Sequence, residues 1–344
     1  MRKNTKILRN RLIFNNYQLE PVQNSALPLQ KTIAMEINRP ISRRTALKVM
    51  GMGMLATCVV PLTSFGKSGK GDKIKRLIFY FSATGNSLYV SREIGGEGSI
   101  LMSIPQEIHN DNPVYEAEEI GFVCPVYCFI PPAIVQDFIA RSTFKADYFF
   151  AVGTYGAHST IFPEFLENFA KEHGVKMDYI STIQMVDTYL PYFDAAREMA
   201  DPKNDRIPER IAAVSASINK HEQYIQPVTQ QDRMITEGYY RGSGRDRQRP
   251  TVTRSEKIVF ATDACVGCGT CTSICPHGSW KLINGHAVPE GDCENCLGCV
   301  HNCPQKAISI IPTPPEPQEP NRNARYRNPH VTLSDLIKAN NQHA

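Results

Sequence analysis

Eight of the eleven cysteines in this chain of 344 residues follow one repeated spacing. The pattern C-x-x-C-x-x-C-x-x-x-C-P occurs at residues 265–276 and again at residues 293–304. Three thiolates two residues apart suit one iron–sulfur cube, and the fourth, followed by proline, reaches across to another cube. The spacing therefore predicts two 4Fe–4S clusters. The predicted ligands are Cys265, Cys268, Cys271 and Cys303 for the first cluster, and Cys293, Cys296, Cys299 and Cys275 for the second.

Two other uses of these cysteines must be weighed against clusters. Pairs of the form C-x-x-C also bind structural zinc, although zinc normally uses two pairs separated by a longer stretch. Disulfides are disfavoured because cysteines this close in sequence form strained bridges. The segment 257–311 resembles the bacterial-type ferredoxin with two 4Fe–4S clusters. That resemblance implies a small α+β domain with short strands near Phe260 and residues 308–311.

A second chemical site is predicted where a buried-strand pattern at 76–81 gives way to a turn and then to helical spacing at 88–93. Hydroxyls and backbone N–H groups that converge on a helix N-terminus bind phosphate. The turn resembles the phosphate loop of flavodoxins, which implies an FMN site; a plain strand–turn–helix with a capping serine is the alternative. The residues predicted to bind the phosphate are Ser82, Thr84, Gly85, Asn86 and Ser87.

Two further apolar strands, at 119–124 and 147–153, are each followed by a loop with a tyrosine. In doubly wound sheets, ligands bind beyond the carboxyl ends of the strands. The flavodoxin resemblance implies that these loops flank the flavin ring, although both tyrosines could simply close the edge of the core. The loop departs from its usual form at Cys128 and Phe129. The predicted ring-contact residues are Pro125, Val126, Tyr127, Thr154, Tyr155 and Gly156.

Weaker strand patterns at 99–104 and 177–186, with helical patterns between the strands, complete the predicted architecture. It is an α/β flavodoxin-like doubly wound parallel sheet plus a small α+β bacterial-type ferredoxin domain. A loop-like insertion at 188–205 would cover the flavin, contact a partner or serve packing alone. The predicted divisions are an N-terminal extension and linker (1–73), a flavodoxin-like domain (74–224), a linker (225–256), the ferredoxin-type domain (257–311) and a Pro-rich tail with a short helix (312–344).

Positive charge is concentrated near the N-terminus. Residues 1–48 hold ten of the 38 Lys and Arg but only two of the 34 Asp and Glu, so the remainder is mildly acidic and gives no indication of nucleic-acid binding. Arg43 and Arg44 precede an apolar run at 49–65, which resembles a twin-arginine signal; a surface helix followed by a buried one is the alternative. Met35 suits a start codon better than Met1.

The signal implies export of the folded protein to the periplasm or the outer face of the cytoplasmic membrane. If the signal does not function, the protein is expected in the cytoplasm. The apolar run is shorter than the ~20 residues that span a bilayer. Membrane association is therefore expected only through the signal or through a lipid anchor at Cys58.

Residues 74–311 together resemble fusions of a flavodoxin-like domain with a double-cluster ferredoxin. The implied function is electron transfer between two 4Fe–4S clusters and an FMN, with the cofactors carrying the chemistry. Alternatives are a self-contained FMN-dependent reductase acting on a quinone or nitro compound, and a redox sensor. No G-x-G-x-x-G follows a strand, so no nicotinamide site is indicated. No catalytic residue is predicted, and the expected partner is a redox protein or a small electron acceptor.

Overall fold

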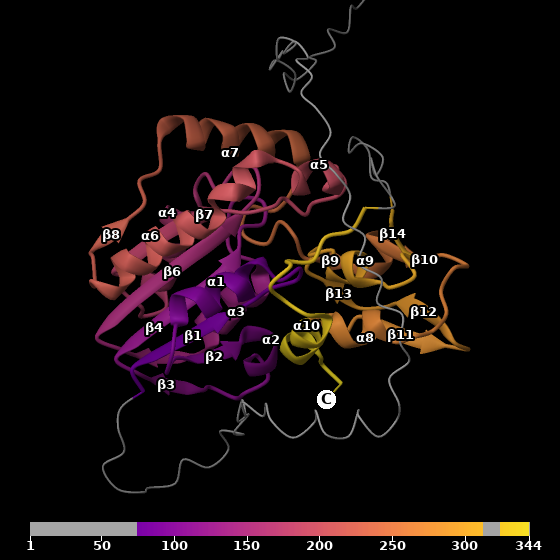
Figure 1. Cartoon of the computed structure of the whole chain (residues 1–344), viewed down its shortest axis with the longest axis horizontal. Helices are drawn as coiled ribbons and strands as arrows, with labels where there is room; N and C mark the ends of the chain where they lie inside the picture. The colour runs from indigo at the N-terminus through magenta and orange to yellow at the C-terminus, as the bar shows by residue number, and fades with distance from the viewer. Residues whose placement is uncertain (1–73, 312–323, 344) are drawn as a thin grey trace, which may run out of the picture. The chain divides into compact units, whose positions relative to one another are not determined.

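The computed structural model describes residues 74–311 and 324–343 (Figure 1). The predicted twin-arginine segment and Cys58 lie outside these ranges. Within them, no helix is long and apolar enough to cross a membrane.

A six-stranded parallel sheet forms the centre of the first part of the chain (Figure 1). Its strand order is β2-β1-β4-β6-β7-β8, and every neighbouring pair is parallel. The strands are β1 (Arg76–Tyr80), β2 (Ile100–Ser103), β4 (Glu119–Pro125), β6 (Tyr148–Tyr155), β7 (Tyr179–Gln184) and β8 (Tyr224–Ile225). All five residues of β1 are buried, as a continuous apolar run in the middle of a parallel sheet should be.

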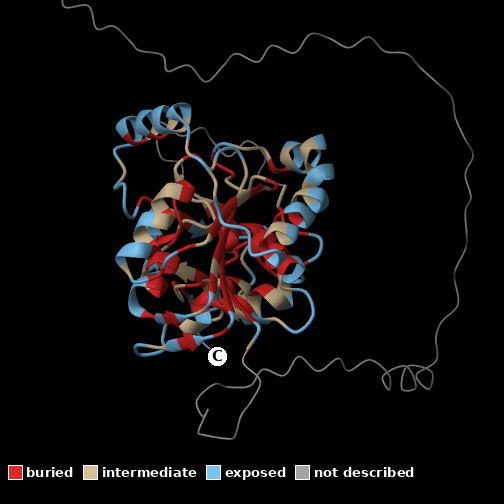
Figure 2. Cartoon of the chain, turned by 90° about the vertical axis from the view of Figure 1, so that its left-hand side faces the viewer, coloured by how far each residue is buried: buried red, intermediate tan, exposed pale blue. Residues whose placement is uncertain are grey.

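Helices cover both faces of the sheet, and the buried residues lie between the layers (Figure 2). One core packs Phe79 and Phe122 of the strands against α3 and α4. The other packs Ile78 and Val152 against α1 and α6. The helices are α1 (Asn86–Gly95), α3 (Ala133–Arg141), α4 (Phe162–Glu172) and α6 (Ile207–Asn219), with the short α2 (Ile104–Glu107) and α5 (Ala195–Met199) and the 3-10 turn η1 (Pro202–Arg206). This strand order and layering define the flavodoxin-like doubly wound fold.

The segment expected as a linker, 225–256, contains regular structure that the sequence interpretation omitted. It supplies the end of β8, the helix α7 (Gln230–Ser243) and the short strand β9 (Thr253–Arg254). A capping box between Thr229 and Asp232 starts α7, while only Thr236 and Tyr240 of the helix are buried. Most residues of this helix are polar and exposed, so the composition of the segment favours a connection over a packed helix.

The ferredoxin-type part is a small α+β unit. Strand β10 (Val259–Ala261) pairs antiparallel with β14 (Ile308–Ile310), as expected from the residues that flank the two motifs. Its other elements are η2 (Ser255–Lys257), α8 (Thr270–Ile274), β11 (Trp280–Ile283), β12 (His286–Pro289), β13 (Asp292–Cys293) and α9 (Gly298–Asn302). In the described part of the chain, the remaining short strands are β3 (Val114–Glu116) and β5 (Thr143–Lys145), which pair in parallel.

The C-terminal segment 324–343 ends in the helix α10 (Leu333–Asn340), which begins with a capping box between Thr332 and Asp335. Leu336 and Ala339 of this helix are buried in the core on the α1 face of the sheet. Ile274 of α8 belongs to the same core, so the segment joins the two parts of the chain. In Figure 1, α10 lies between α2 and α8.

Candidate metal centres and the predicted flavin loops

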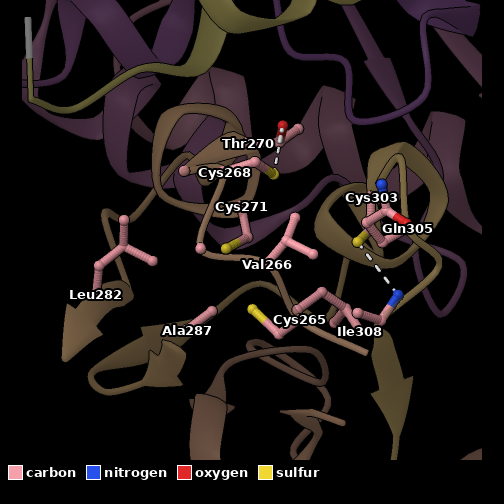
Figure 3. A pocket seen from close by; sticks show the side chains of 13 residues that line it. Cys265, Val266, Cys268, Thr270, Cys271, Leu282, Ala287, Cys303, Gln305 and Ile308 are labelled. Carbon is pink, nitrogen blue, oxygen red and sulfur yellow. Dashed lines mark hydrogen bonds between the residues drawn. The ribbon is translucent and has the colours of Figure 1, made fainter. Parts of the chain in front are cut away.

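Four cysteines of the ferredoxin-type part line one pocket (Figure 3). Three of them, Cys265, Cys268 and Cys271, come from the loop that leads into α8 and from its first turn. The fourth, Cys303, follows α9 and belongs to the other motif. The structure thus brings together the four residues that the spacing grouped as ligands of the first cluster.

The loop around this pocket depends on a glycine at position 267. Gly267 has a φ of +65°, and a Cβ there would lie 2.3 Å from the backbone oxygen of Gly285. Any other residue would be strained by its conformation and would also clash with backbone. Gly267 therefore lets Cys265 and Cys268 face the same pocket.

The residues that line a second pocket include Cys275, Cys293, Cys296 and Cys299. Here too, three cysteines come from one motif and the fourth from the other. Cys271 lies in α8 and Cys275 directly follows it, so this helix contributes to both pockets. The helix α9 does the same through Cys299 and Cys303.

Backbone N–H groups point at cysteine sulfurs in both pockets. The N–H of Ala307 donates to Cys303 Sγ over 3.2 Å at the first pocket. At the second pocket, Asn295 donates to Cys293 Sγ over 3.3 Å and Ser279 to Cys275 Sγ over 3.4 Å. Such bonds stabilise thiolates and set the reduction potential of a bound cluster.

The thiols differ in their electrostatic surroundings. Burial raises the pKa of Cys271 and of Cys293 to about 12, and it raises the pKa of Cys296 and Cys299 well above the usual value. At the exposed Cys268, a hydrogen bond with the Thr270 hydroxyl instead lowers the pKa. Among the described residues, no three His, Cys, Asp or Glu side chains converge as ligands of a single metal ion. The donor set of each pocket, four thiols spread around a shared space, fits an iron–sulfur cube.

A buried carboxylate in the second motif anchors that pocket to the flavodoxin-like part. Glu294, between Cys293 and Cys296, is 1% exposed. Its two oxygens accept from the N–H groups of Ala133 (2.7 Å) and Ile134 (3.2 Å) at the start of α3. The Thr251 hydroxyl also donates to it over 2.8 Å, and His277 Nε2 lies 3.1 Å away. Sequence analysis missed this role, because no spacing rule connects position 294 with a helix 160 residues earlier.

The helix α9 makes a second junction with the flavodoxin-like part. A Cβ on Gly298 would lie 3.3 Å from the backbone oxygen of Ala83, in the predicted phosphate loop. His301 Nε2 donates to the Thr188 oxygen over 2.8 Å, and its Nδ1 accepts from the Tyr326 N–H over 3.0 Å. Burial lowers the pKa of His301 to about 4, so the ring is neutral as this pattern requires. The insertion that contains Thr188 therefore contacts the ferredoxin-type part of the same chain.

The five residues of the predicted phosphate loop lie together at the end of β1, but they bond to other parts of the chain. The Ser82 hydroxyl accepts from the Gly85 N–H over 3.1 Å, and the Ser87 hydroxyl lies 2.8 Å from that of Thr154. The Asn86 side chain bonds on both sides, to Val186 and to the C-terminal segment. The structure also places the Asn328 N–H on the Thr84 oxygen. In this arrangement the side chains of the loop bond within the chain, and the C-terminal segment contacts the loop.

The predicted ring-contact loops are brought to the same edge of the sheet. The Val126 N–H donates to the Thr154 oxygen over 2.8 Å, which joins the loop of Pro125, Val126 and Tyr127 to that of Thr154, Tyr155 and Gly156. A Cβ on Gly156 would meet Asp187 at 2.0 Å, so this loop is tightly packed. The Tyr127 ring is edge-on to Phe81, with centroids 6.4 Å apart.

Helix α7 covers the outer part of the first of these loops. Cys128 and Phe129 both have a left-handed φ, 49° and 74°, which is uncommon for residues other than glycine. The Tyr240 hydroxyl donates to the Cys128 oxygen over 2.7 Å, and the Tyr239 ring packs edge-on against Phe129. The contacts of α7 therefore hold the loop in its unusual conformation.

Comparison with known proteins places the cysteine motifs in a family. The model of the 4Fe–4S binding domain matches residues 257–280. An uncharacterized ferredoxin of Methanocaldococcus jannaschii is 35% identical over 74 residues, which are 20% of this chain and 96% of the ferredoxin. A ferredoxin of Thermococcus litoralis is 39% identical over 57 residues, 16% of this chain and 97% of its own length. Through its C-terminal part, the chain belongs to the ferredoxins that bind 4Fe–4S clusters.

Comparison with solved structures gives a more distant match. The solution structure of Megasphaera elsdenii flavodoxin is 14% identical and covers 31% of this chain and 84% of its own, with a TM-score of 0.21. The fold class therefore rests on the strand order and layering of the sheet.

Proposed function

We propose that the chain is an electron-transfer protein that moves single electrons through two 4Fe–4S clusters, one in each cysteine-lined pocket. One observation carries the proposal: each pocket gathers three cysteines of one motif and the last cysteine of the other. The first cluster is assigned to the set that ends with Cys303, and the second to the set that includes Cys275. When bound, the clusters supply one-electron chemistry.

The chain's own residues connect and tune these two sites. The helices α8 and α9 each carry a cysteine of one pocket and are followed by a cysteine of the other. The proposed clusters are therefore linked by short covalent paths. Backbone donors from Ala307, Asn295 and Ser279 stabilise negative charge on the sulfurs, which influences how readily each cluster accepts an electron.

The donor and acceptor are proposed to be a redox partner protein or a small electron acceptor. A self-contained flavin reductase would need a flavin at the end of β1, where the loop is already bonded within the chain. The proposed electron path therefore runs through the clusters alone.

A reductive titration tests the proposal. The anaerobically purified chain should take up about two electrons, one for each cluster, and return them to an added one-electron acceptor. It should show no turnover of quinone or nitro compounds when NAD(P)H is the only donor. Steady turnover of such a compound with NAD(P)H would contradict the assignment as a carrier.

We also propose export by the twin-arginine route, which is supported by the sequence pattern around Arg43 and Arg44. The route carries folded proteins, so a chain with cofactors inserted in the cytoplasm can cross intact. Replacing both arginines by lysine should leave the protein in the cytoplasm. Identical fractionation of the wild type and the double-lysine variant would rule out this signal.

A further inference from the structure

The C-terminal segment covers the loop at the end of β1. The N–H of Asn328 donates to the Thr84 oxygen over 2.8 Å, and Asn340 Nδ2 donates to the Ser82 oxygen over 3.0 Å. These bonds join positions more than 240 residues apart in sequence. The segment is therefore fixed on this loop by specific contacts.

The side chain of Asn86 is the main point of attachment. Its Oδ1 accepts from the Tyr326 hydroxyl over 2.7 Å and from Asn328 Nδ2 over 3.1 Å. Its Nδ2 donates to the Val186 oxygen over 3.2 Å. Asn86, Tyr326 and Asn328 are all buried, so each bond is shielded from water. This polar cluster holds the segment in one position on the loop.

Apolar packing closes the same place. A Cβ added to Gly85 would lie 2.9 Å from Asn328 Cβ and 3.0 Å from Val331 Cβ. The segment is thus in direct contact with the N-cap of α1. Asn328 and Val331 therefore occupy the space directly beside Gly85.

The loop beneath the segment nevertheless has the chemistry of an anion site. Gly85 provides no side-chain cap for α1, and the first turn of that helix has no acidic residue. The N–H groups of a first helical turn have no partner within the helix, and the helix dipole favours negative charge there. The hydroxyls of Ser87 and Thr154 lie beside this turn.

We propose that the segment 325–340 is a built-in occupant of this loop and competes with the phosphate of a flavin mononucleotide for it. In the closed arrangement the loop takes no FMN, and loosening the segment uncovers the anion site. This inference does not depend on how many clusters the chain binds.

The test compares FMN binding to the full chain and to a variant in which the segment is loosened. Tyr326→Phe with Asn328→Ala removes both side-chain hydrogen bonds to Asn86 Oδ1. Two net hydrogen bonds correspond to about a tenfold change in affinity. We expect weak FMN binding to the wild type and binding about tenfold tighter in the double variant, measured by quenching of flavin fluorescence. Riboflavin, which lacks the phosphate, should gain nothing.

Lys338→Ala is the matched control, because this residue is exposed on α10 and belongs to the same segment. It should bind FMN as the wild type does. Far-UV circular dichroism and iron content of the double variant show whether it is folded; if it is not, Asn328→Ala alone repeats the comparison. Equal FMN affinity in the wild type and the loosened variants, or no FMN binding in any of them, would overturn the proposal.

Discussion

The two cysteine-lined pockets are built from the same motif but lie in different surroundings. Residues that line the first pocket include the exposed Cys268, together with Val266 and Leu282, which are 64% and 43% exposed. No residue that lines the second pocket is classed as exposed. Cys296 packs against one core of the flavodoxin-like part and Cys299 against the other. The same motif thus yields one site open to solvent and one enclosed by a second fold.

This difference suggests a division of labour between the two proposed clusters. Electron transfer with a partner requires close approach, which the open edge at Cys268 permits. The second motif instead contacts the flavodoxin-like part at Glu294, Gly298 and His301. In this chain, the edge of the sheet where doubly wound proteins bind ligands serves as the support for an iron–sulfur site.

The largest expected effect is the loss of one cluster when the single cysteine that the other motif contributes to it is replaced. Cys303→Ser should deplete the open site, although residue 303 belongs to the second motif. Cys275→Ser should deplete the enclosed site. Each variant should lose about half of its iron, because each site would hold four iron ions. Electron paramagnetic resonance of the reduced proteins then assigns a signal to each site, and loss of the same signal in both variants would break the comparison.

A smaller effect is expected from removing the anchor of the enclosed site. Glu294→Ala leaves the N–H groups of Ala133 and Ile134 without their buried acceptor and should destabilise the chain by about 3 kcal/mol. Glu290→Ala is the control, because Glu290 is exposed and its ion pair with Lys281 should contribute less than about 1 kcal/mol.

Urea unfolding followed by circular dichroism measures both variants. Glu294→Ala should also release iron from the enclosed site before the open one. Equal stability of the two variants would show that Glu294 is no anchor.

Much of this architecture could be predicted from local patterns. The buried run at 76–81 and the repeated cysteine spacing identify the sheet and the cluster motifs, because each depends on neighbours in sequence. The cover over the phosphate loop could not be predicted. Its contacts join Asn86 with Tyr326 and Asn328, and no periodicity relates positions so far apart. Helix α7 could not be predicted for another reason: its residues are mostly polar, and only Thr236 and Tyr240 are buried.

The smallest expected effect is on the pH dependence of stability, and it should leave both cysteine sites unchanged. Asp187 lies beside Gly156 in the flavodoxin-like part, and its pKa is raised to about 6, chiefly by burial. The charge of Glu198 adds to this shift, while the hydrogen bond from the Tyr189 N–H and the charge of Lys203 oppose it. The folded chain therefore binds this proton more tightly than the unfolded chain does. Its contribution to stability is present below about pH 4 and is lost as the pH rises through about 6.

Asp187→Asn keeps an acceptor for the Tyr189 N–H but does not titrate. Relative to the wild type, it should gain about 1–2 kcal/mol of stability between pH 4 and pH 7. Thermal unfolding across this range measures the gain. If the difference in stability between the two proteins is the same at every pH, Asp187 is not the titrating group. If the variant loses iron, Asp187 also affects the cysteine sites.

Chemical analysis of the anaerobically purified chain tests the central claim most directly. Two 4Fe–4S clusters predict about eight iron and eight acid-labile sulfide per chain. The closed loop at Gly85 predicts no stoichiometric flavin. About two zinc ions per chain without sulfide would contradict the clusters, and one tightly bound FMN would contradict the closed loop.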